Sequence, residues 1–186
     1  GITVKGLTFQ ASYTYMRSRD QSSFSCCSAT QGFAAATTGG NPNELGWATS
    51  DFERRHSILL TASYAVSQSL EITTVTRLMS GTPFTPMVGN DINGDGAAND
   101  RAFIFAASAQ DTAVANGMSR LLASSSSSIR SCLMSQTGAI AARNSCEGSW
   151  QPAADLQLNF PPTWWGLDRR MTFMLSTVNM LAGIDE

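Results

Sequence analysis

The chain has 186 residues, enough for one ordinary domain with a sizeable core. Lys and Arg number 12 and Asp and Glu number 14, so the charge balance offers no basic surface and we expect no nucleic-acid partner. No stretch reaches the ~18–20 consecutive apolar residues that a membrane-spanning helix requires.

Apolar and polar side chains alternate with a period of two in five segments, a pattern typical of half-buried antiparallel strands. In the first segment, apolar or aromatic side chains from Leu7 to Tyr15 alternate with Thr, Gln and Ser. Each of the other segments likewise has one apolar and one polar face. We predict strands near residues 4–17, 55–67, 69–80, 152–161 and 169–180.

The connections between these strands differ greatly in length. Short stretches, "VSQS" and "PPTWWGLD", link the second strand to the third and the fourth to the fifth, whereas residues 18–52 and 81–150 form long loops. Short turns at one end and long extracellular loops at the other are typical of bacterial outer-membrane barrels. Soluble barrels and sandwiches usually have short connections at both ends. The sequence therefore predicts an all-β fold, a segment of an antiparallel up-and-down transmembrane β-barrel.

Polar and aromatic side chains fit the same interpretation. Charged and amide groups such as Glu71 recur on the polar face, where a small dry core would penalise them and a wet barrel lumen would not. Tyr13 and Tyr15 lie near the loop end of the first strand, and Trp164 and Trp165 lie in a short turn, as expected for aromatic girdles at the two membrane interfaces. The alternative is a soluble sandwich with one solvated face.

The long connection at residues 81–150 has structure of its own. Within it, "DTAVANGMSRLLA" and "SSSIRSCLMSQTG" carry apolar residues at helical spacing, and the second begins with capping serines and ends at a glycine. We predict two short helices here.

The four cysteines are Cys26, Cys27, Cys132 and Cys146, an even set in polar, loop-like sequence. No Cys-x-x-Cys pair occurs, so disulfides formed outside the cytoplasm are favoured over a zinc site. Of the three possible connectivities, Cys132–Cys146 closes the shortest sensible loop and would constrain the unfolded chain by ~3 kcal/mol. Pairing of either vicinal cysteine with the other two stays open.

The stretch "DINGDGAAND" has the residue types of a calcium-binding loop. Short oxygen-bearing side chains occupy its positions 1, 3 and 5, followed by Gly96 for the sharp turn, as in the first half of an EF-hand loop. Position 12 departs from that pattern, because Ala102 stands where a bidentate Glu is expected. The alternative is a loop of Asx-turns that needs no metal. The predicted calcium ligands are Asp91, Asn93, Asp95, Asn99 and Asp100.

Nothing in the sequence points to catalysis. His56 is the only histidine and lies at a loop–strand boundary, where a structural hydrogen bond is the usual role. No serine lies in a nucleophile-elbow pattern. We expect no enzymatic activity.

One longer stretch, "RLMSGTPFTPMVGNDINGDGAANDRAF", resembles the barrel of TonB-dependent outer-membrane receptors, in particular the Oar-like group with a carboxypeptidase-regulatory-like N-terminal domain. In that group a strand ending in SG-x-P-aromatic-T-P leads into a loop with D-x-NGDG-x-x-ND-R. The segments "SDFERRHSILLTASY" and "AARNSCEGSWQPAADLQLNF" resemble the family's D-x-RH strand start and its later loop-to-strand passage. The matching motif positions are Ser80, Gly81, Pro83, Phe84, Thr85, Pro86, Asp91, Asn93, Gly94, Asp95, Gly96, Asn99, Asp100 and Arg101.

The resemblance covers most of the chain from about Asp51 onward and implies a piece of a receptor. Such barrels have about 22 strands around a plug, and five strands cannot close a lumen of that kind. Residues 1–186 are therefore expected to form the C-terminal part of a barrel, a fragment of a larger receptor in the outer membrane of a Gram-negative-type bacterium. The implied partners are outer-membrane lipid, the rest of the barrel with its plug, and a TonB-type periplasmic energiser.

The function implied is ligand uptake, with this chain supplying wall and extracellular loops. Two alternatives stay open. One is a structural or adhesin-like outer-membrane scaffold without transport. The other is a secreted, soluble calcium-binding β-domain.

Overall fold

A computed structural model describes most of the chain. The described residues are 1–21, 41, 46–162 and 171–183. The chain divides into two compact units. The first, here called the sheet unit, comprises Gly1–Tyr15, Arg55–Ser80 and Trp150–Glu186. The second, here called the loop unit, comprises Met16–Arg54 and Gly81–Ser149, and so consists of the two long connections.

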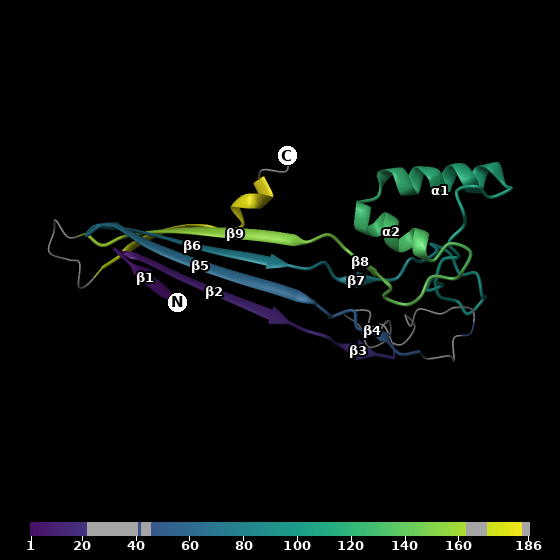
Figure 1. The fold of residues 1–186 in the computed structure, drawn as a ribbon, viewed down its shortest axis with the longest axis horizontal. Helices are drawn as coiled ribbons and strands as arrows, with labels where there is room; N and C mark the ends of the chain where they lie inside the picture. The colour runs from purple at the N-terminus through teal and green to yellow at the C-terminus, as the bar shows by residue number, and fades with distance from the viewer. Residues whose placement is uncertain (22–40, 42–45, 163–170, 184–186) are drawn as a thin grey trace. The chain divides into compact units, whose positions relative to one another are not determined.

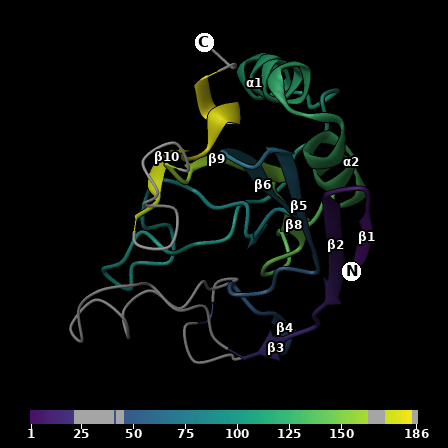
Figure 2. The same ribbon diagram turned by 90° about the vertical axis from the view of Figure 1, so that its left-hand side faces the viewer.

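The sheet unit is one antiparallel sheet with the strand order β1-β2-β5-β6-β9-β10 (Figures 1 and 2). Neighbours in the sheet follow one another in the unit's chain order, which is the predicted up-and-down arrangement. The fold class predicted from the sequence is confirmed. The strands are β1 (Ile2–Val4), β2 (Leu7–Tyr15), β5 (His56–Ser67), β6 (Leu70–Met79), β9 (Gln151–Phe160) and β10 (Phe173–Thr177).

The N-terminal part of the sheet differs from the prediction of one strand at residues 4–17. A tight turn at Lys5 and Gly6, both with positive φ (45° and 82°), divides this segment into β1 and β2. Glycine adopts such a φ without a steric penalty, which makes it suited to the second turn position. The strand predicted at 169–180 is shorter in the structure, where β10 spans Phe173–Thr177.

The register of the sheet gathers the apolar sides of the separate strands onto one face. Tyr13 lies opposite Ile58, Ile58 opposite Leu78, and Leu78 opposite Pro152, and directly opposed residues project to the same side. Alternate residues of β2, β5, β6, β9 and β10 then form a continuous apolar face. Its larger side chains are Leu7, Phe9, Tyr13, Tyr15, Ile58, Leu60, Tyr64, Ile72, Leu78, Leu156, Leu158, Phe160, Phe173 and Leu175.

The described residues of the sheet unit leave much of this apolar face exposed or half-exposed. Among the described side chains of the sheet unit, Ala154 and Pro162 are the only buried apolar ones, while Tyr13 is 60% and Leu175 61% exposed. A contiguous apolar surface of this extent marks a surface that another phase or partner covers. The face therefore has the chemistry of a lipid-facing barrel wall.

The opposite face of the sheet is polar and internally hydrogen-bonded. Arg77 Nη1 lies 2.7 Å from Asp155 Oδ2 between adjacent strands. The Ser63 and Thr73 hydroxyls are 2.9 Å apart. A single 3-10 turn, η2 (Met180–Gly183), follows the last strand. Such pairs suit a wet lumen, where charges keep much of their hydration.

The loop unit combines short ladders with the two predicted helices, α1 (Thr112–Ser124) and α2 (Ser127–Ser135). β3 (Arg19–Asp20) pairs with β4 (Ala48–Thr49), and β7 (Pro83–Phe84) pairs with β8 (Cys146–Glu147). These ladders of two residues are too short for a period of two to reveal in the sequence. None of the described helices is long and apolar enough to cross a membrane.

Both helices begin at capping side chains, and for α2 the sequence indicates the serine cap. The Asp111 carboxylate accepts from Ala113 N at 2.8 Å, and the Ser126 hydroxyl accepts from Ile129 N at 3.4 Å. The apolar sides of the helices meet a small core in which Ile104, Leu133 and Ala141 are buried. The loop unit thus has a hydrophobic core of its own.

Candidate functional site

The two long connections leave the sheet at the same end of its strands, where the first motif residues lie. β2 ends at Tyr15, which pairs with the first residue of β5, His56. β6 ends at Met79, which pairs with the first residue of β9, Gln151. Each of these strand pairs is joined by a long connection, so both connections start and finish at this end of the strands.

Ser80 extends the hydrogen-bond ladder between β6 and β5 by one residue beyond the end of β6. Its backbone N–H donates to His56 O at 2.9 Å, and its hydroxyl accepts from His56 N at 3.2 Å. Ser80 is completely buried. A side chain that satisfies a neighbouring backbone group in this way explains the serine of the SG-x-P motif.

Gly81 is required by a close approach of backbone inside the loop unit. A Cβ at this position would lie 2.1 Å from Gly148 O, well inside contact distance. The adjacent Gly148 N donates to Thr82 O at 3.0 Å, next to the β7–β8 ladder. Only glycine lets the two segments approach so closely.

Thr85 joins the motif to the end of the same long connection. Its hydroxyl donates to Asn144 Oδ1 at 3.0 Å and accepts from Asn144 N at 2.9 Å. Asn144 has a positive φ of 51°, a conformation that asparagine tolerates better than most residues. This reciprocal pair fixes the segment that leads into Cys146.

The stretch predicted to bind calcium forms the tip of a hairpin-like turn. Met87 and Arg101 form an antiparallel bridge, and Val88 N donates to Asp100 O at 2.9 Å. The Asp91 carboxylate then accepts from Gly94 N at 2.7 Å and from Gly96 N at 2.9 Å.

The other acidic and amide side chains of the turn also accept from nearby backbone. Asp100 Oδ2 accepts from Ile92 N at 2.6 Å, Asn93 Oδ1 from Asp95 N at 2.9 Å, and Asp95 Oδ1 from Ala97 N at 2.9 Å. The contacts of Asn93 and Asp95 are Asx-turn contacts, whereas that of Asp100 joins the two ends of the turn, and both kinds order the loop through backbone hydrogen bonds. Within the described residues, no three His, Cys, Asp or Glu side chains are gathered as a metal-binding group.

Of the predicted calcium ligands, Asn99 and Asp100 are buried at the base of the turn. Asp91, Asn93 and Asp95 lie toward its tip, where Asn93 Nδ2 donates to Asp95 Oδ2 at 3.2 Å. The five residues therefore lie in one turn of the chain, and the carboxylates among them accept hydrogen bonds from backbone N–H groups. Calcium binding stays a prediction.

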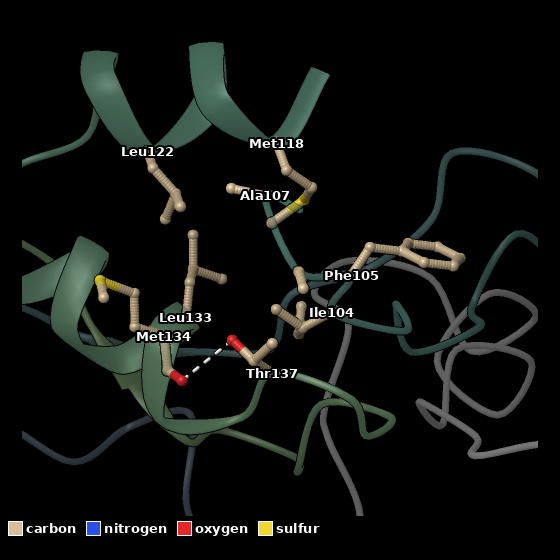
Figure 3. A pocket seen from close by; sticks show the side chains of 9 residues that line it. Ile104, Phe105, Ala107, Met118, Leu122, Leu133, Met134 and Thr137 are labelled. Carbon is tan, nitrogen blue, oxygen red and sulfur yellow. Dashed lines mark hydrogen bonds between the residues drawn. The ribbon is translucent and has the colours of Figure 1, made fainter. Parts of the chain in front are cut away.

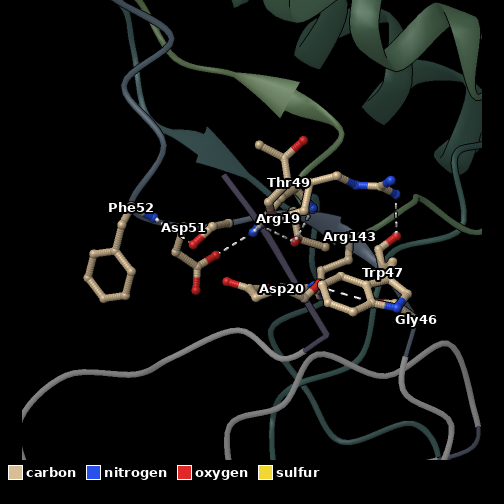
Figure 4. Close-up of polar contacts among 11 residues, drawn as sticks. Arg19, Asp20, Gly46, Trp47, Thr49, Asp51, Phe52 and Arg143 are labelled. Atoms are coloured by element: carbon tan, nitrogen blue, oxygen red, sulfur yellow. Dashed lines mark hydrogen bonds and ion pairs between the residues drawn. The ribbon is translucent and has the colours of Figure 1, made fainter. Parts of the chain in front are cut away.

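A buried polar cluster joins the two long connections inside the loop unit (Figure 4). The Arg143 side chain is 7% exposed, and its Nη1 lies 2.7 Å from Asp20 Oδ1. Its Nη2 donates to the carbonyls of Asp20 and Gly46. Since Asp20 and Arg143 are 123 positions apart in sequence, the cluster fixes one connection against the other.

Asn144 extends the same cluster. Its amide Nδ2 donates to Thr49 O at 2.7 Å and to the Asp51 carboxylate. Nearby, Glu53 is 1% exposed and accepts from Ser18 N at 2.7 Å. Sequence reasoning did not identify Arg143, Asn144 or Glu53 as site residues, because no local pattern marks contacts between such distant segments.

The predicted Cys132–Cys146 disulfide is present and joins α2 to β8, with Cα atoms 5.6 Å apart. Cys146 is buried in the small core. Gln136 packs beside the bridge, and its Oε1 accepts from Ala142 N at 2.8 Å. The disulfide therefore fixes the helices to the segment that carries Arg143. Cys26 and Cys27 lie outside the described residues.

The predicted interface aromatics of β2 form part of a row of rings on the apolar face. Tyr13 OH lies 2.8 Å from His56 Nδ1, and Tyr15 lies against the same ring at 5.6 Å between centroids. Trp150, which directly precedes β9, stacks on His56 with 6.1 Å between ring centroids and 10° between ring planes. Sequence reasoning missed the part played by His56 and Trp150. Trp164, Trp165 and their predicted girdle lie outside the described residues.

Two comparisons found nothing and one found a family. A family model described as "Outer membrane beta barrel domain" matches residues 3–160. No curated protein and no solved structure matches. The matched region runs from β1 to the end of β9 and includes both long connections.

Proposed function

Because the chain belongs to the outer membrane beta barrel domain family, we propose that it forms wall and extracellular loops of a TonB-dependent receptor for ligand uptake. The observation that supports this proposal is that the loop unit is ordered by contacts of its own. It has its own core, a disulfide, and an ion pair between the buried Arg143 and the partly exposed Asp20. Loops that are ordered before a ligand arrives lose less entropy on binding, which favours capture.

The two faces of the sheet suggest how the wall works. The apolar face contacts membrane lipid, and the polar face with Arg77 and Asp155 lines the lumen. The long connections lie outside the cell and the short turns in the periplasm, as is usual for such barrels. The ring cluster of Tyr13, Tyr15, His56 and Trp150 then lies at the extracellular interface between the outer membrane and water.

The motif residues support the TonB-dependent receptor in particular. Ser80 satisfies a backbone group at the start of β5 in the sheet unit, and Gly81 and Thr85 make close contacts inside the loop unit, so each motif residue has a distinct structural task. In this proposal the rest of the barrel holds a plug, and a TonB-type periplasmic protein supplies the energy that rearranges it. The chain itself carries out no chemical step.

The turn at residues 90–100 is proposed to bind calcium as a structural ion. Hard oxygen donors at alternate positions and a positive φ of 87° at Gly96 fit the first half of a calcium loop. The Asx-turn contacts already place these oxygens in one turn. Bound calcium would stiffen the turn and would take no part in moving the ligand.

Direct binding to the energiser tests the receptor proposal. The full-length parent protein, reconstituted in lipid nanodiscs, is titrated with the purified periplasmic domain of a TonB-type protein from the same organism. Saturable binding is expected, and it should be lost when the parent's TonB-binding segment is deleted. A parent that does not bind the energiser is instead the scaffold or adhesin-like protein. The soluble secreted alternative is disfavoured by the family and by the uncovered apolar face.

A further inference from the structure

An apolar pocket lies inside the loop unit, between the two helices and the segment that precedes them (Figure 3). Its volume is about 120 Å³. Met118 and Leu122 extend from α1 toward Leu133 and Ile104. An engineered protein cavity of about 150 Å³ with similar walls binds benzene, so the space is on the scale of one hydrocarbon ring.

The walls of this pocket carry no charge. Its lining consists of Ala, Ile, Leu, Met and Phe together with Thr137. The Thr137 hydroxyl, the one side-chain polar group of this lining, donates to Met134 O at 3.0 Å. No lining side chain therefore offers an unused N–H or cationic group, and a charged guest would lose its hydration without compensation.

Polar contacts around the pocket hold its walls in place. Arg130 of α2 donates to Leu122 O at 2.7 Å and to Ser125 O at 3.1 Å, which fixes α2 to the C-terminal end of α1. The Cys132–Cys146 disulfide fixes the other side of α2. Walls fixed on both sides cannot close easily over the space, so an apolar guest gains contacts there at little reorganisation cost.

The methionines at the pocket suit it to a guest. Met118 and Met134 have flexible thioether side chains that adapt to the outline of a ligand and contact aromatic rings favourably. Met134 is 59% exposed, so the pocket has an edge that solvent reaches.

We propose that this pocket is a binding subsite for an uncharged hydrocarbon group, such as a single aromatic or alicyclic ring. The inference rests on the proposed function only in assigning that ring to the ligand that the receptor takes up. The subsite would then select ligands with an exposed apolar ring, while the polar surfaces of the loops contact the remainder.

Methyl-labelled methionine offers a direct test. The full-length parent protein, labelled with ¹³C-methyl methionine and reconstituted in lipid nanodiscs, is titrated with benzene, and with benzoate as a charged probe of similar size. We expect saturable shifts of the Met118 and Met134 methyl signals with benzene and none with benzoate. Met87, which lies in the loop unit but does not line the pocket, should not shift saturably.

A filling variant and its matched control sharpen the test. Ala107→Leu places a larger side chain at the pocket wall and should abolish the saturable shifts, whereas Ala123→Leu, on an exposed part of α1, should retain them. Equal shifts with benzoate, shifts that persist in a folded Ala107→Leu variant, or no saturable shift with benzene would overturn the subsite. If Ala107→Leu does not fold, the benzene and benzoate titrations of the unaltered chain still decide.

The outcomes also separate this inference from the receptor proposal. Benzene binding by a parent that does not bind the TonB-type domain would leave the subsite and remove the uptake role. Binding of the TonB-type domain with no benzene shift would do the reverse.

Discussion

The sheet unit and the loop unit depend on different surroundings for their stability. The loop unit has a core around Ile104 and Leu133, a disulfide, and an ion pair whose arginine, Arg143, is buried. The described part of the sheet unit buries two apolar side chains, Ala154 and Pro162, and presents an apolar face to its surroundings. A barrel wall is completed by lipid and by neighbouring strands, whereas a loop domain in water has to bury its own apolar groups.

A charge on the apolar face should have the largest effect. Leu60→Arg places a cation in mid-strand on the face that contacts lipid and should lower the free energy of unfolding by about 2–4 kcal/mol. Thr61→Arg, the next residue, projects to the polar face and is the matched control, with a change near zero. Urea titration of the protein in lipid vesicles measures both. Equal losses would mean that the two faces do not differ in their surroundings.

Removal of the disulfide should act on the loop unit alone. Replacing Cys132 and Cys146 by serine should destabilise the loop unit by about 3 kcal/mol, because the unfolded loop regains its entropy. Hydrogen exchange of α2 should accelerate while that of β5 and β6 stays unchanged. Faster exchange throughout the sheet would show that the two units unfold together.

A methyl group at Gly81 should disturb the start of the loop unit. Gly81→Ala forces the backbone at Gly148 to move, since the new Cβ would lie 2.1 Å from its carbonyl oxygen. Overpacking of this kind costs about 1–3 kcal/mol. Gly89→Ala, with open space around the Cβ, is the control. Hydrogen exchange of the β7 and β8 amides, measured at increasing temperature, compares the unfolding of the two glycine variants. Unaltered exchange at these amides in Gly81→Ala would contradict the expectation.

Loss of one hydroxyl should have the smallest effect. Thr85→Val keeps the shape of the side chain but removes both bonds to Asn144, and should cost about 1 kcal/mol. Thr85→Ser retains the hydroxyl and serves as the control. Exchange rates of the amides around Asn144 report the difference. A valine variant no weaker than the serine variant would show that the pair does not order this segment.

Much of the sheet could be predicted because its two faces meet different surroundings. That difference imposes a period of two over as many as twelve residues, as in β5, and a pattern of this length is visible in the sequence. The helices could be predicted from apolar residues at helical spacing and, for α2, from capping serines, of which Ser126 is the cap in the structure. Each of these features depends on residues close together in the chain.

The contacts within the loop unit could not be predicted in the same way. Arg143 meets Asp20, and Asn144 meets Thr49, across long stretches of sequence that show no periodicity. The stacking of Trp150 on His56 depends on strand register, which local patterns do not give. Calcium at Asp91 and its neighbours remains a prediction, because the same short oxygen-bearing side chains serve Asx-turns and metal ions alike.

In the barrel that we propose, one face of this sheet contacts lipid and the other lines a wet lumen. Nitroxide labels at single cysteines introduced in turn at positions 58 to 63, with Cys26 and Cys27 replaced by serine, measure it directly in lipid vesicles. We expect even-numbered positions to be accessible to molecular oxygen and odd-numbered positions to be accessible to a water-soluble nickel complex. Uniform accessibility along β5, or an alternation of the opposite phase, would contradict it.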